Sequence, residues 1–133
     1  MNPGTSHRVL VVDDHEGMRA LCAVMLHRLG YEPVTAATAG AALEQAGSSH
    51  YDLVLSDQEM PGGDGLGLLR RLRARGEPMP FVLMSTDIEE AVVRAAYGAG
   101  AALVVDKTRV IEALPQVLER ALGRRALPEP LAA

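Results

Sequence analysis

Short apolar runs alternate along this chain with segments whose apolar residues recur every three or four positions. The runs predict β-strands, and the recurrence predicts helices that pack through one face. The strands are expected at residues 8–12, 32–37, 53–55, 81–84 and 103–105. Each is followed by an expected helix, beginning near residues 18, 39, 65, 87 and 108. Strand and helix therefore alternate five times, with a short connection at every step.

This alternation predicts an α/β fold in which parallel strands form one doubly wound sheet with helices on both faces. The crossover connections are expected to be right-handed. The first, third and fourth strands are the most apolar and are expected at the centre of the sheet. The second strand carries Glu32 and Pro33. Because proline cannot donate to a neighbouring strand, this strand is expected at an edge.

Polar residues and one proline indicate where the helices begin. Thr38 and Asp64 are expected to cap the second and third helices, and Thr108 the last. Asp87, with a glutamate three residues later, forms a capping-box pattern at the fourth helix. Pro115 fits only the first turn of a helix, so the last helix is expected to start late. The apolar side chains expected to face the core are Met18, Leu21, Cys22, Met25, Leu26 and Leu29; Leu66, Leu69 and Leu72; Ile88, Ala91, Val92 and Ala95; and Val110, Leu114, Val117, Leu118 and Ala121.

The composition indicates one domain whose core is built from Val, Leu, Ala and Met, because only four of the 133 residues are aromatic. Residues 8–123 are expected to form it, with a loose N-terminus at 1–7 and a tail or linker stub at 124–133. The net charge of −4 argues against general nucleic-acid or anionic-membrane binding. One cysteine and no long apolar run favour a cytoplasmic protein. The sequence leaves open whether the chain stands alone or belongs to a longer protein.

Polar residues follow the predicted strands where the apolar runs stop. The carboxyl ends of parallel strands meet at one edge of the sheet, which is where ligands bind in open α/β folds. These polar residues are therefore expected to lie together. They are Asp13 and Asp14 after the first strand, Asp57 after the third, Ser85 and Thr86 after the fourth, and Lys107 after the fifth.

The chemistry of this set points to phosphoryl transfer. Crowded carboxylates repel one another, and a divalent cation relieves the repulsion; an all-oxygen site suits Mg²⁺. The hydroxyl and ammonium groups add donors for phosphoryl oxygens. An aspartate carboxylate can accept a phosphoryl group covalently, so one of these aspartates is the expected acceptor, and Lys107 can pair with Asp57. His15, beside the acidic pair, is expected to be an exposed residue rather than a ligand.

Over roughly residues 8–123 the chain resembles the response-regulator receiver domain of bacterial two-component signalling. Successive spacings of 44, 28 and 22 residues separate Asp13, Asp57, Ser85 and Lys107 and fit the family pattern. The resemblance implies a flavodoxin-like (βα)5 fold, like that of the single-domain chemotaxis regulators, with strand order 2-1-3-4-5. The stretches that carry it are Val11-Val-Asp-Asp14, Asp52-Leu-Val-Leu-Ser-Asp57, Met60-Pro61, Asp64-Gly65, Val82-Leu-Met-Ser85 and Lys107.

The resemblance also implies Mg²⁺ as the cofactor and a role for each site residue. At the phosphoryl group, the implied roles are phosphoacceptor for Asp57, hydroxyl donor for Ser85, ion-pair partner for Lys107 and a possible backbone contact for Thr86. At the metal, the implied ligands are Asp14 directly, Asp13 through a water, Asp57, and the backbone carbonyl of Glu59.

The chain departs from the family pattern at two positions. Thr108 follows Lys107 where the family usually has proline after a cis bond, and a non-proline cis bond costs about 2.5–4 kcal/mol. Val104 stands where the family usually has an aromatic residue that rotates on activation, so coupling through that residue is not expected. Glu59 and Asp87 add negative charge beside the pocket and are expected to alter the lifetime of the phosphoryl group or the approach of an attacking water.

The resulting interpretation is a phosphorylation-controlled signalling switch that promotes its own phosphoryl transfer and autodephosphorylation but turns over no external substrate. The expected partners are a sensor histidine kinase or histidine phosphotransfer protein, and an output protein or domain at the face of the fourth helix, fifth strand and fifth helix. The alternative is a pseudo-receiver, a protein-binding module with weak or no phospho-switching, which the residues at 104 and 108 favour. A Mg²⁺-dependent phosphatase is disfavoured because position 59 is glutamate rather than a second aspartate.

Overall fold

A computed structural model of the chain describes residues 7–123. Five strands alternate with five helices in this range, as predicted. The strands are β1 (Arg8–Val12), β2 (Glu32–Ala36), β3 (Leu53–Asp57), β4 (Phe81–Ser85) and β5 (Leu103–Asp106). The helices are α1 (Glu16–Arg28), α2 (Ala39–Ser48), α3 (Gly65–Ala74), α4 (Glu90–Gly98) and α5 (Val110–Leu122).

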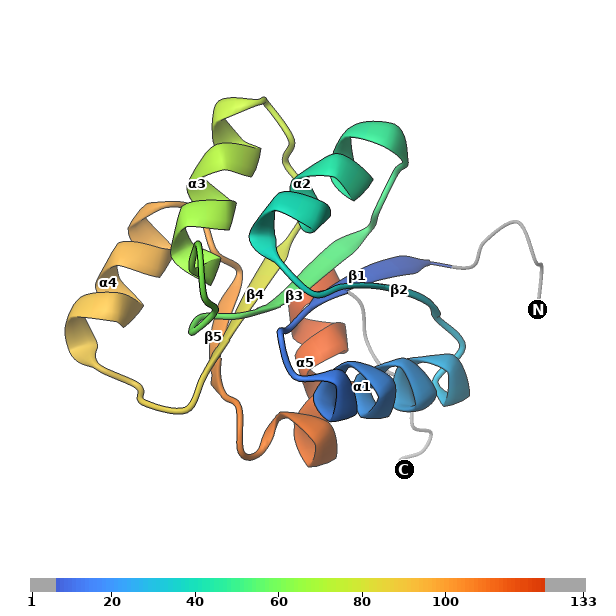
Figure 1. Cartoon of the computed structure of the whole chain (residues 1–133). Coiled ribbons are helices and arrows are strands. Elements are labelled where there is room, and N and C mark those ends of the chain that lie inside the picture. Colours follow the sequence, from blue (N-terminus) through green and yellow to red (C-terminus); the bar gives the residue numbers. More distant parts are fainter. Residues whose placement is uncertain (1–6, 124–133) are drawn as a thin grey trace.

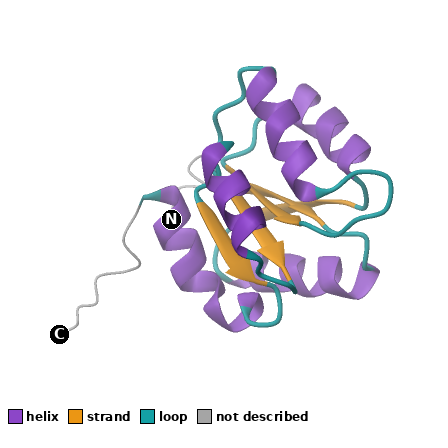
Figure 2. Cartoon of the chain, turned by 90° about the vertical axis from the view of Figure 1, so that its left-hand side faces the viewer, coloured by secondary structure: helices purple, strands orange, loops and turns teal. Residues whose placement is uncertain are grey.

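The strands form one parallel sheet in the order β2-β1-β3-β4-β5, which confirms the predicted doubly wound, flavodoxin-like topology. Helices α2, α3 and α4 lie on one face of this sheet, and α1 and α5 lie on the other (Figure 1). Figure 2 shows the sheet between these two helical layers. The strand that carries Pro33 is at one edge, as predicted, and β5 is at the other.

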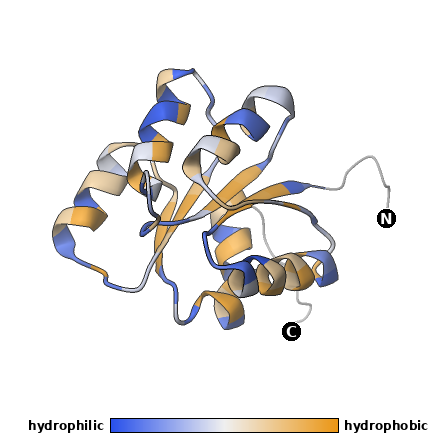
Figure 3. Ribbon diagram, in the orientation of Figure 1, coloured by the Kyte–Doolittle hydropathy of each residue, from blue (hydrophilic) through white to orange (hydrophobic). Residues whose placement is uncertain are grey.

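Alternate strand residues point to opposite faces of the sheet, so the central strands contribute to two separate cores. In β1, Leu10 and Val12 pack in the core beneath α2, α3 and α4, whereas Val9 and Val11 pack in the core beneath α1 and α5. β3 and β4 are buried along their whole length. Figure 3 shows these strands as an apolar centre, whereas the helices around them mix hydrophobic and hydrophilic segments.

The start of α4 differs from the prediction. The helix begins at Glu90 with Glu89 in the cap position and no side-chain cap hydrogen bond, so the predicted capping box at Asp87 is wrong. Ile88 precedes the helix and is 45% exposed. The buried residue of α4 is Ala96, and the predicted inward residue Ala91 is exposed. The late start of this short helix moves the buried position toward its C-terminal end.

Two of the remaining predicted caps are confirmed and one is wrong. Thr38 accepts a hydrogen bond from the backbone at the start of α2, and Asp64 does so at the start of α3. Thr108 does not cap α5, because its backbone N–H and its hydroxyl both donate to Asp106 Oδ1. Arg109 occupies the cap position of α5 without a side-chain cap hydrogen bond.

The helices on the second face also depart from prediction at single positions. Pro115 lies inside α5 rather than in its first turn, so the predicted late start is wrong. The proline is exposed, and water can hydrate the carbonyl that its missing N–H leaves unpaired. In α1 only Cys22 and Leu26 are buried; Leu21 is 46% exposed, and Leu29, directly after the helix, is 38% exposed. The five core residues predicted for α5 are all buried.

Candidate functional site

Three of the predicted site residues meet at the carboxyl edge of the sheet. Asp57 is the last residue of β3, Asp13 directly follows β1, and Lys107 directly follows β5. Residues two positions apart on a strand point to the same face. Asp13 and Asp57 therefore continue the rows of Val11 and Leu55, on the face that α1 and α5 cover. The strand period of two brings their carboxylates to one place.

Lys107 lies between two buried carboxylates. Its Nζ is 2.8 Å from Asp13 Oδ2 and 3.0 Å from Asp57 Oδ2, and its side chain is 10% exposed. Burial alone would lower the pKa of Lys107, but its close contacts with the carboxylates of Asp13 and Asp57 outweigh burial and raise that pKa. Burial raises the pKa of Asp57, and the hydrogen bond from Lys107 opposes this rise. The ammonium group stays charged and offsets the repulsion between the carboxylates.

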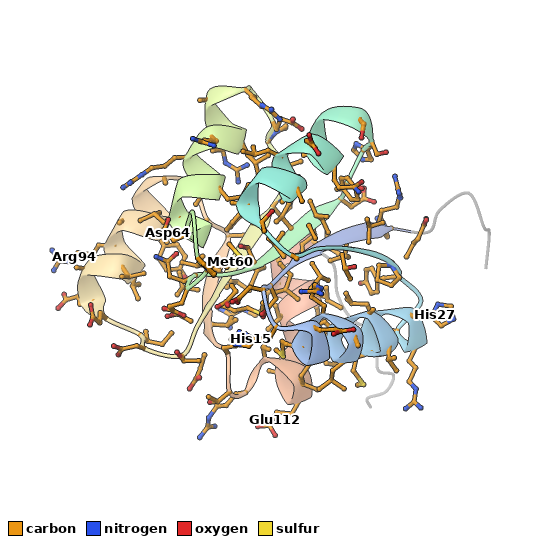
Figure 4. All side chains as sticks on the ribbon, viewed as in Figure 1. His15, His27, Met60, Asp64, Arg94 and Glu112 are labelled. Atoms are coloured by element: carbon orange, nitrogen blue, oxygen red, sulfur yellow. The ribbon has the colours of Figure 1, made fainter. Side chains whose placement is uncertain are left out.

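Asp14 and His15 bring two further ligand atoms to this cluster. His15 Nδ1 is 3.2 Å from Asp13 Oδ1 and 3.3 Å from Asp14 Oδ1. The His15 side chain is 68% exposed, as predicted, and lies at the start of α1 (Figure 4). Its contacts with the acidic pair were not predicted. A local sequence signal could have predicted these contacts, because aspartate favours a turn in which its side chain accepts from the backbone two residues later. The backbone N–H of His15 donates to Asp13 Oδ1 in this way, at 2.9 Å.

The acidic pocket could hold a small, hard divalent cation. One ligand atom from each of Asp13, Asp14, His15 and Asp57 lies within 4.8 Å of the others. Within residues 7–123 Asp14 Oδ1 is buried and accepts no hydrogen bond, although His15 Nδ1 lies 3.3 Å from it, so it can still offer a lone pair to the cluster. Asp13 Oδ2 makes no hydrogen bond of good geometry either, although it pairs with Lys107. Three carboxylates in one pocket match the oxygen-rich coordination that Mg²⁺ prefers.

Ser85 points to the other face of the sheet. It continues the row of Phe81 and Leu83 in β4, which pack beneath α2, α3 and α4. Its buried hydroxyl donates to Glu59 Oε2 at 2.8 Å, with the Asp87 carbonyl at 3.1 Å as a second acceptor. The backbone N–H of Asp87 in turn donates to Ser85 Oγ at 3.3 Å. The sequence predicted extra negative charge from Glu59 and Asp87, but it carried no signal of these hydrogen bonds.

The loop after β3 is fixed tightly against the phosphoacceptor candidate. The Gln58 side chain donates to Asp64 Oδ2 at 3.2 Å and accepts from the Leu66 N–H at 2.9 Å. Gly65 packs so closely that an added Cβ would lie 2.5 Å from the carbonyl oxygen of Asp57. The end of β3 and the start of α3 therefore form one rigid unit around Asp57.

An open, acidic groove lies between this loop and α4. Glu59 belongs to both the groove and the Ser85 contact. Thr86 is exposed in the loop that leads from β4 toward α4, and its backbone contact with a phosphoryl group stays a prediction. Met60 and Asp64 mark the loop side of the groove in Figure 4. The groove is lined by Gln58, Glu59, Met60, Pro61, Asp64, Asp87, Glu89 and Val92.

The two departures from the family pattern have definite geometries. The Lys107–Thr108 bond is trans, since no peptide bond within residues 7–123 is cis. Lys107 nevertheless reaches both aspartates. Val104 is partly buried and packs against the core beneath α2, α3 and α4. Its backbone N–H donates to the hydroxyl of Tyr97 on α4 at 3.1 Å.

Comparison with known proteins decides the family. A model of the response regulator receiver domain matches residues 9–119. The chain belongs to the response regulator receiver domain family. This receiver domain therefore belongs to a family of two-component signalling switches rather than of enzymes that turn over a substrate.

The receiver domain matches parts of longer signalling proteins. It is 32% identical over 130 residues to the sensory/regulatory protein RpfC of Xanthomonas campestris, covering 94% of this chain and 18% of RpfC. It is 43% identical over 74 residues to the sensor histidine kinase RcsC of Escherichia coli, covering 56% of this chain and 8% of RcsC. The chain thus spans less than a fifth of the length of these relatives.

A solved structure supports the fold at similar identity. The response regulator TrrA of Thermotoga maritima, solved in complex with Mg²⁺-BeF, superimposes with a TM-score of 0.78 at 31% identity. The superposition covers 87% of this chain and 99% of TrrA. The receiver fold predicted from the strand-end residues is confirmed by both the family match and this superposition.

Proposed function

We propose that this receiver domain is a phosphorylation-controlled switch in which Asp57 accepts a phosphoryl group from a histidine kinase or a histidine phosphotransfer protein. The observation that carries the proposal is the Lys107 ammonium group, shared between the buried carboxylates of Asp13 and Asp57 at 2.8 and 3.0 Å. This contact keeps a carboxylate anion available in a buried pocket. Acceptance of a phosphoryl group needs such an anion.

In the proposed step, Asp57 Oδ1 attacks the phosphorus of a phosphohistidine or an acyl phosphate. Oδ1 accepts the longer of the two Asp57 hydrogen bonds, 3.3 Å from the N–H of Glu59, while Oδ2 accepts from Lys107. A P–O bond to Asp57 forms as the P–N or P–O bond to the donor breaks, and the electron pair leaves with the imidazole or the carboxylate. Lys107 then stabilises the negative charge of the acyl phosphate.

Mg²⁺ is the proposed cofactor, held by Asp14 directly, Asp13 through a water, Asp57, and the backbone carbonyl of Glu59. When bound, it would neutralise charge on the transferred phosphoryl group. The buried oxygen of Asp14 that lacks a hydrogen bond supports this assignment. So does the Mg²⁺-BeF group named in the TrrA structure.

Ser85 is proposed to donate its hydroxyl to the phosphoryl group, and Thr86 to add a backbone contact. In the unphosphorylated protein the Ser85 hydroxyl is held by Glu59 at 2.8 Å. The proposed role therefore requires Ser85 to exchange Glu59 for a phosphoryl oxygen. That exchange links chemistry on the α1–α5 face of the sheet to the loop before α4.

The proposed partners follow from the family and the relatives. Similarity to receiver segments of RpfC and RcsC supports a histidine kinase as the phosphoryl source. The proposed output surface is the face of α4, β5 and α5, and direct nucleic-acid binding by this domain is not proposed. A cytoplasmic location is also a proposal; no helix within residues 7–123 is long and apolar enough to cross a membrane.

A second function is a pseudo-receiver module that binds partners without responding to phosphorylation. The observation that favours it is the occupied Ser85 hydroxyl together with valine at position 104. In this case a phosphoryl group on Asp57 would leave the α4–β5–α5 face unchanged.

Intact-protein mass spectrometry tests the proposed function. The parent is incubated with acetyl phosphate and Mg²⁺, and we expect the mass increase of one phosphoryl group, lost in Asp57→Asn and absent when the metal is chelated. Asp52→Asn is the matched control, because Asp52 lies at the opposite end of β3 and bonds to Arg8 instead. Absence of the adduct with both acetyl phosphate and a phosphorylated phosphotransfer domain would contradict the proposal. An adduct that leaves the amide spectrum of α4 and β5 unchanged would select the pseudo-receiver.

A further inference from the structure

Tyr97 joins α4 to the edge strand of the sheet. Its hydroxyl accepts a 3.1 Å hydrogen bond from the backbone N–H of Val104 in β5. The tyrosine belongs to the last turn of α4 and is 46% exposed. The sequence placed no functional residue at this position. The structure thus puts an aromatic ring from the helix beside the strand position where valine stands.

The Val104 amide lies on the open side of the sheet. In the described part of the chain β5 pairs with β4 alone, and successive N–H groups of a strand point to opposite sides. An edge N–H would ordinarily be left to water. Tyr97 satisfies it instead, so exchange of this amide with solvent reports directly on whether α4 stays against β5.

The other end of α4 is connected to the phosphorylation pocket. The Ser85 hydroxyl bonds to both backbone groups of Asp87, three residues before the helix starts, and to Glu59. Between these two attachments α4 is packed weakly, with Ala96 as its fully buried residue. A helix with so little buried surface can shift at low cost. Movement of Ser85 would therefore pull on one end of α4 while Tyr97 holds the other.

We propose that the Tyr97–Val104 hydrogen bond is the latch that holds α4 in its unphosphorylated position and that phosphorylation of Asp57 opens it. This inference rests on the proposed function. When Ser85 turns toward the phosphoryl group, it gives up Glu59 and Asp87, the loop before α4 moves, and the phenol leaves the β5 edge. The released Tyr97 then changes the surface that α4 and β5 present to a partner.

Linkage gives the proposal a quantitative form. If phosphorylation lowers the equilibrium constant for forming the Tyr97–Val104 hydrogen bond by some factor, removal of that bond must raise the equilibrium constant for phosphorylation by the same factor. Loss of one neutral hydrogen bond corresponds to roughly a fivefold change in such an equilibrium constant. Tyr97→Phe removes the hydroxyl and keeps the ring, so it isolates this bond.

Amide hydrogen exchange of Val104 tests the latch in the full chain. We expect a protected amide in the unphosphorylated parent and exchange about fivefold faster after treatment with acetyl phosphate and Mg²⁺. In Tyr97→Phe the amide is expected to exchange fast in both states, and the phosphorylated fraction at limiting acetyl phosphate is expected to rise. Tyr51→Phe is the matched control, since its hydroxyl bonds to Gln45 on α2, and it should leave both readouts unchanged.

Mass measurement on the same samples separates the possible failures. A confirmed adduct with unchanged Val104 protection overturns the latch and leaves the proposed function intact. Equal protection in the parent and Tyr97→Phe also overturns the latch, because the hydroxyl then protects nothing. Absence of any adduct overturns the proposed function, and the latch with it.

Discussion

Removal of the Glu59 carboxylate should favour the phosphorylated state, because that carboxylate competes for the Ser85 hydroxyl. The 2.8 Å bond from Ser85 to Glu59 must break before Ser85 can donate to a phosphoryl oxygen. A hydrogen bond to a charged group contributes about 1.5–3 kcal/mol when buried. Because Glu59 is exposed, about 1 kcal/mol is the more suitable figure.

This energy sets the size of the expected effect. About 1 kcal/mol corresponds to roughly a fivefold rise in the ratio of phosphorylation rate to dephosphorylation rate for Glu59→Ala. Glu59→Gln keeps a neutral acceptor about half as strong, so roughly a twofold rise is expected. The expected order is therefore Ala above Gln above the parent.

The assay follows phosphorylation by acetyl phosphate and decay after donor removal, with mass spectrometry as the readout. Glu89→Ala and Glu89→Gln are the matched controls. Glu89 lines the same groove and carries the same charge, but its side chain makes no cap hydrogen bond. Equal effects at positions 59 and 89 would show that general charge, not the Ser85 contact, is responsible. Kinetics of Glu59→Ala identical to the parent would refute the competition itself.

Other substitutions test the packing and electrostatics around Asp57. Gly65→Ala should lower the free energy of unfolding by about 2 kcal/mol or more, because the added Cβ would lie 2.5 Å from the Asp57 carbonyl oxygen. Urea unfolding measures this loss, and it should show none for the control Gly17→Ala, whose Cβ would meet no described atom within 4 Å. Burial raises the pKa of Asp57, so the chemical shift of its carboxyl carbon in a metal-free NMR titration should change at a higher pH than that of an ordinary aspartate. Because the folded protein then binds this proton more tightly than the unfolded chain, lowering the pH through that pKa should stabilise the folded state. Lys107→Met should raise the pKa of Asp57 further, because the hydrogen bond from Lys107 lowers it; a fall would contradict the ion pair. Pro115→Ala should raise the free energy of unfolding by about 1 kcal/mol by restoring a helical N–H, and an unchanged urea midpoint would show that the missing N–H at position 115 does not destabilise α5.

The fold and the core of the site could be predicted because both depend on strand periodicity. Apolar runs place the strands, and a residue at a strand end inherits the face of the residue two positions earlier. Asp13 and Asp57 are brought together in this way, and Lys107 reaches them from the end of the edge strand β5, on the far side of β4. The strand register is strongly determined, because a shift of one residue would move every side chain of the strand to the opposite face of the sheet.

The features that could not be predicted from the sequence are side-chain contacts between residues of different helices, strands and loops. The bond between Ser85 and Glu59 joins residues 26 positions apart, and no local pattern encodes it. Tyr97 meets Val104 through a phenol on one element and a backbone amide on another. The misplaced start of α4 has a different cause. Asp87 satisfies a capping pattern, yet the Ser85 hydroxyl binds its backbone and holds it outside the helix.

Chemical mapping of the phosphoryl group tests the central assignment most directly. The adduct formed with acetyl phosphate and Mg²⁺ is reduced with borohydride, which converts a phosphorylated aspartate to homoserine, and the peptides are then sequenced by mass spectrometry. We expect homoserine at position 57 alone. Modification at Asp13, Asp14 or Glu59 instead, or an unmodified Asp57 in a protein that carries the phosphoryl mass, would contradict it.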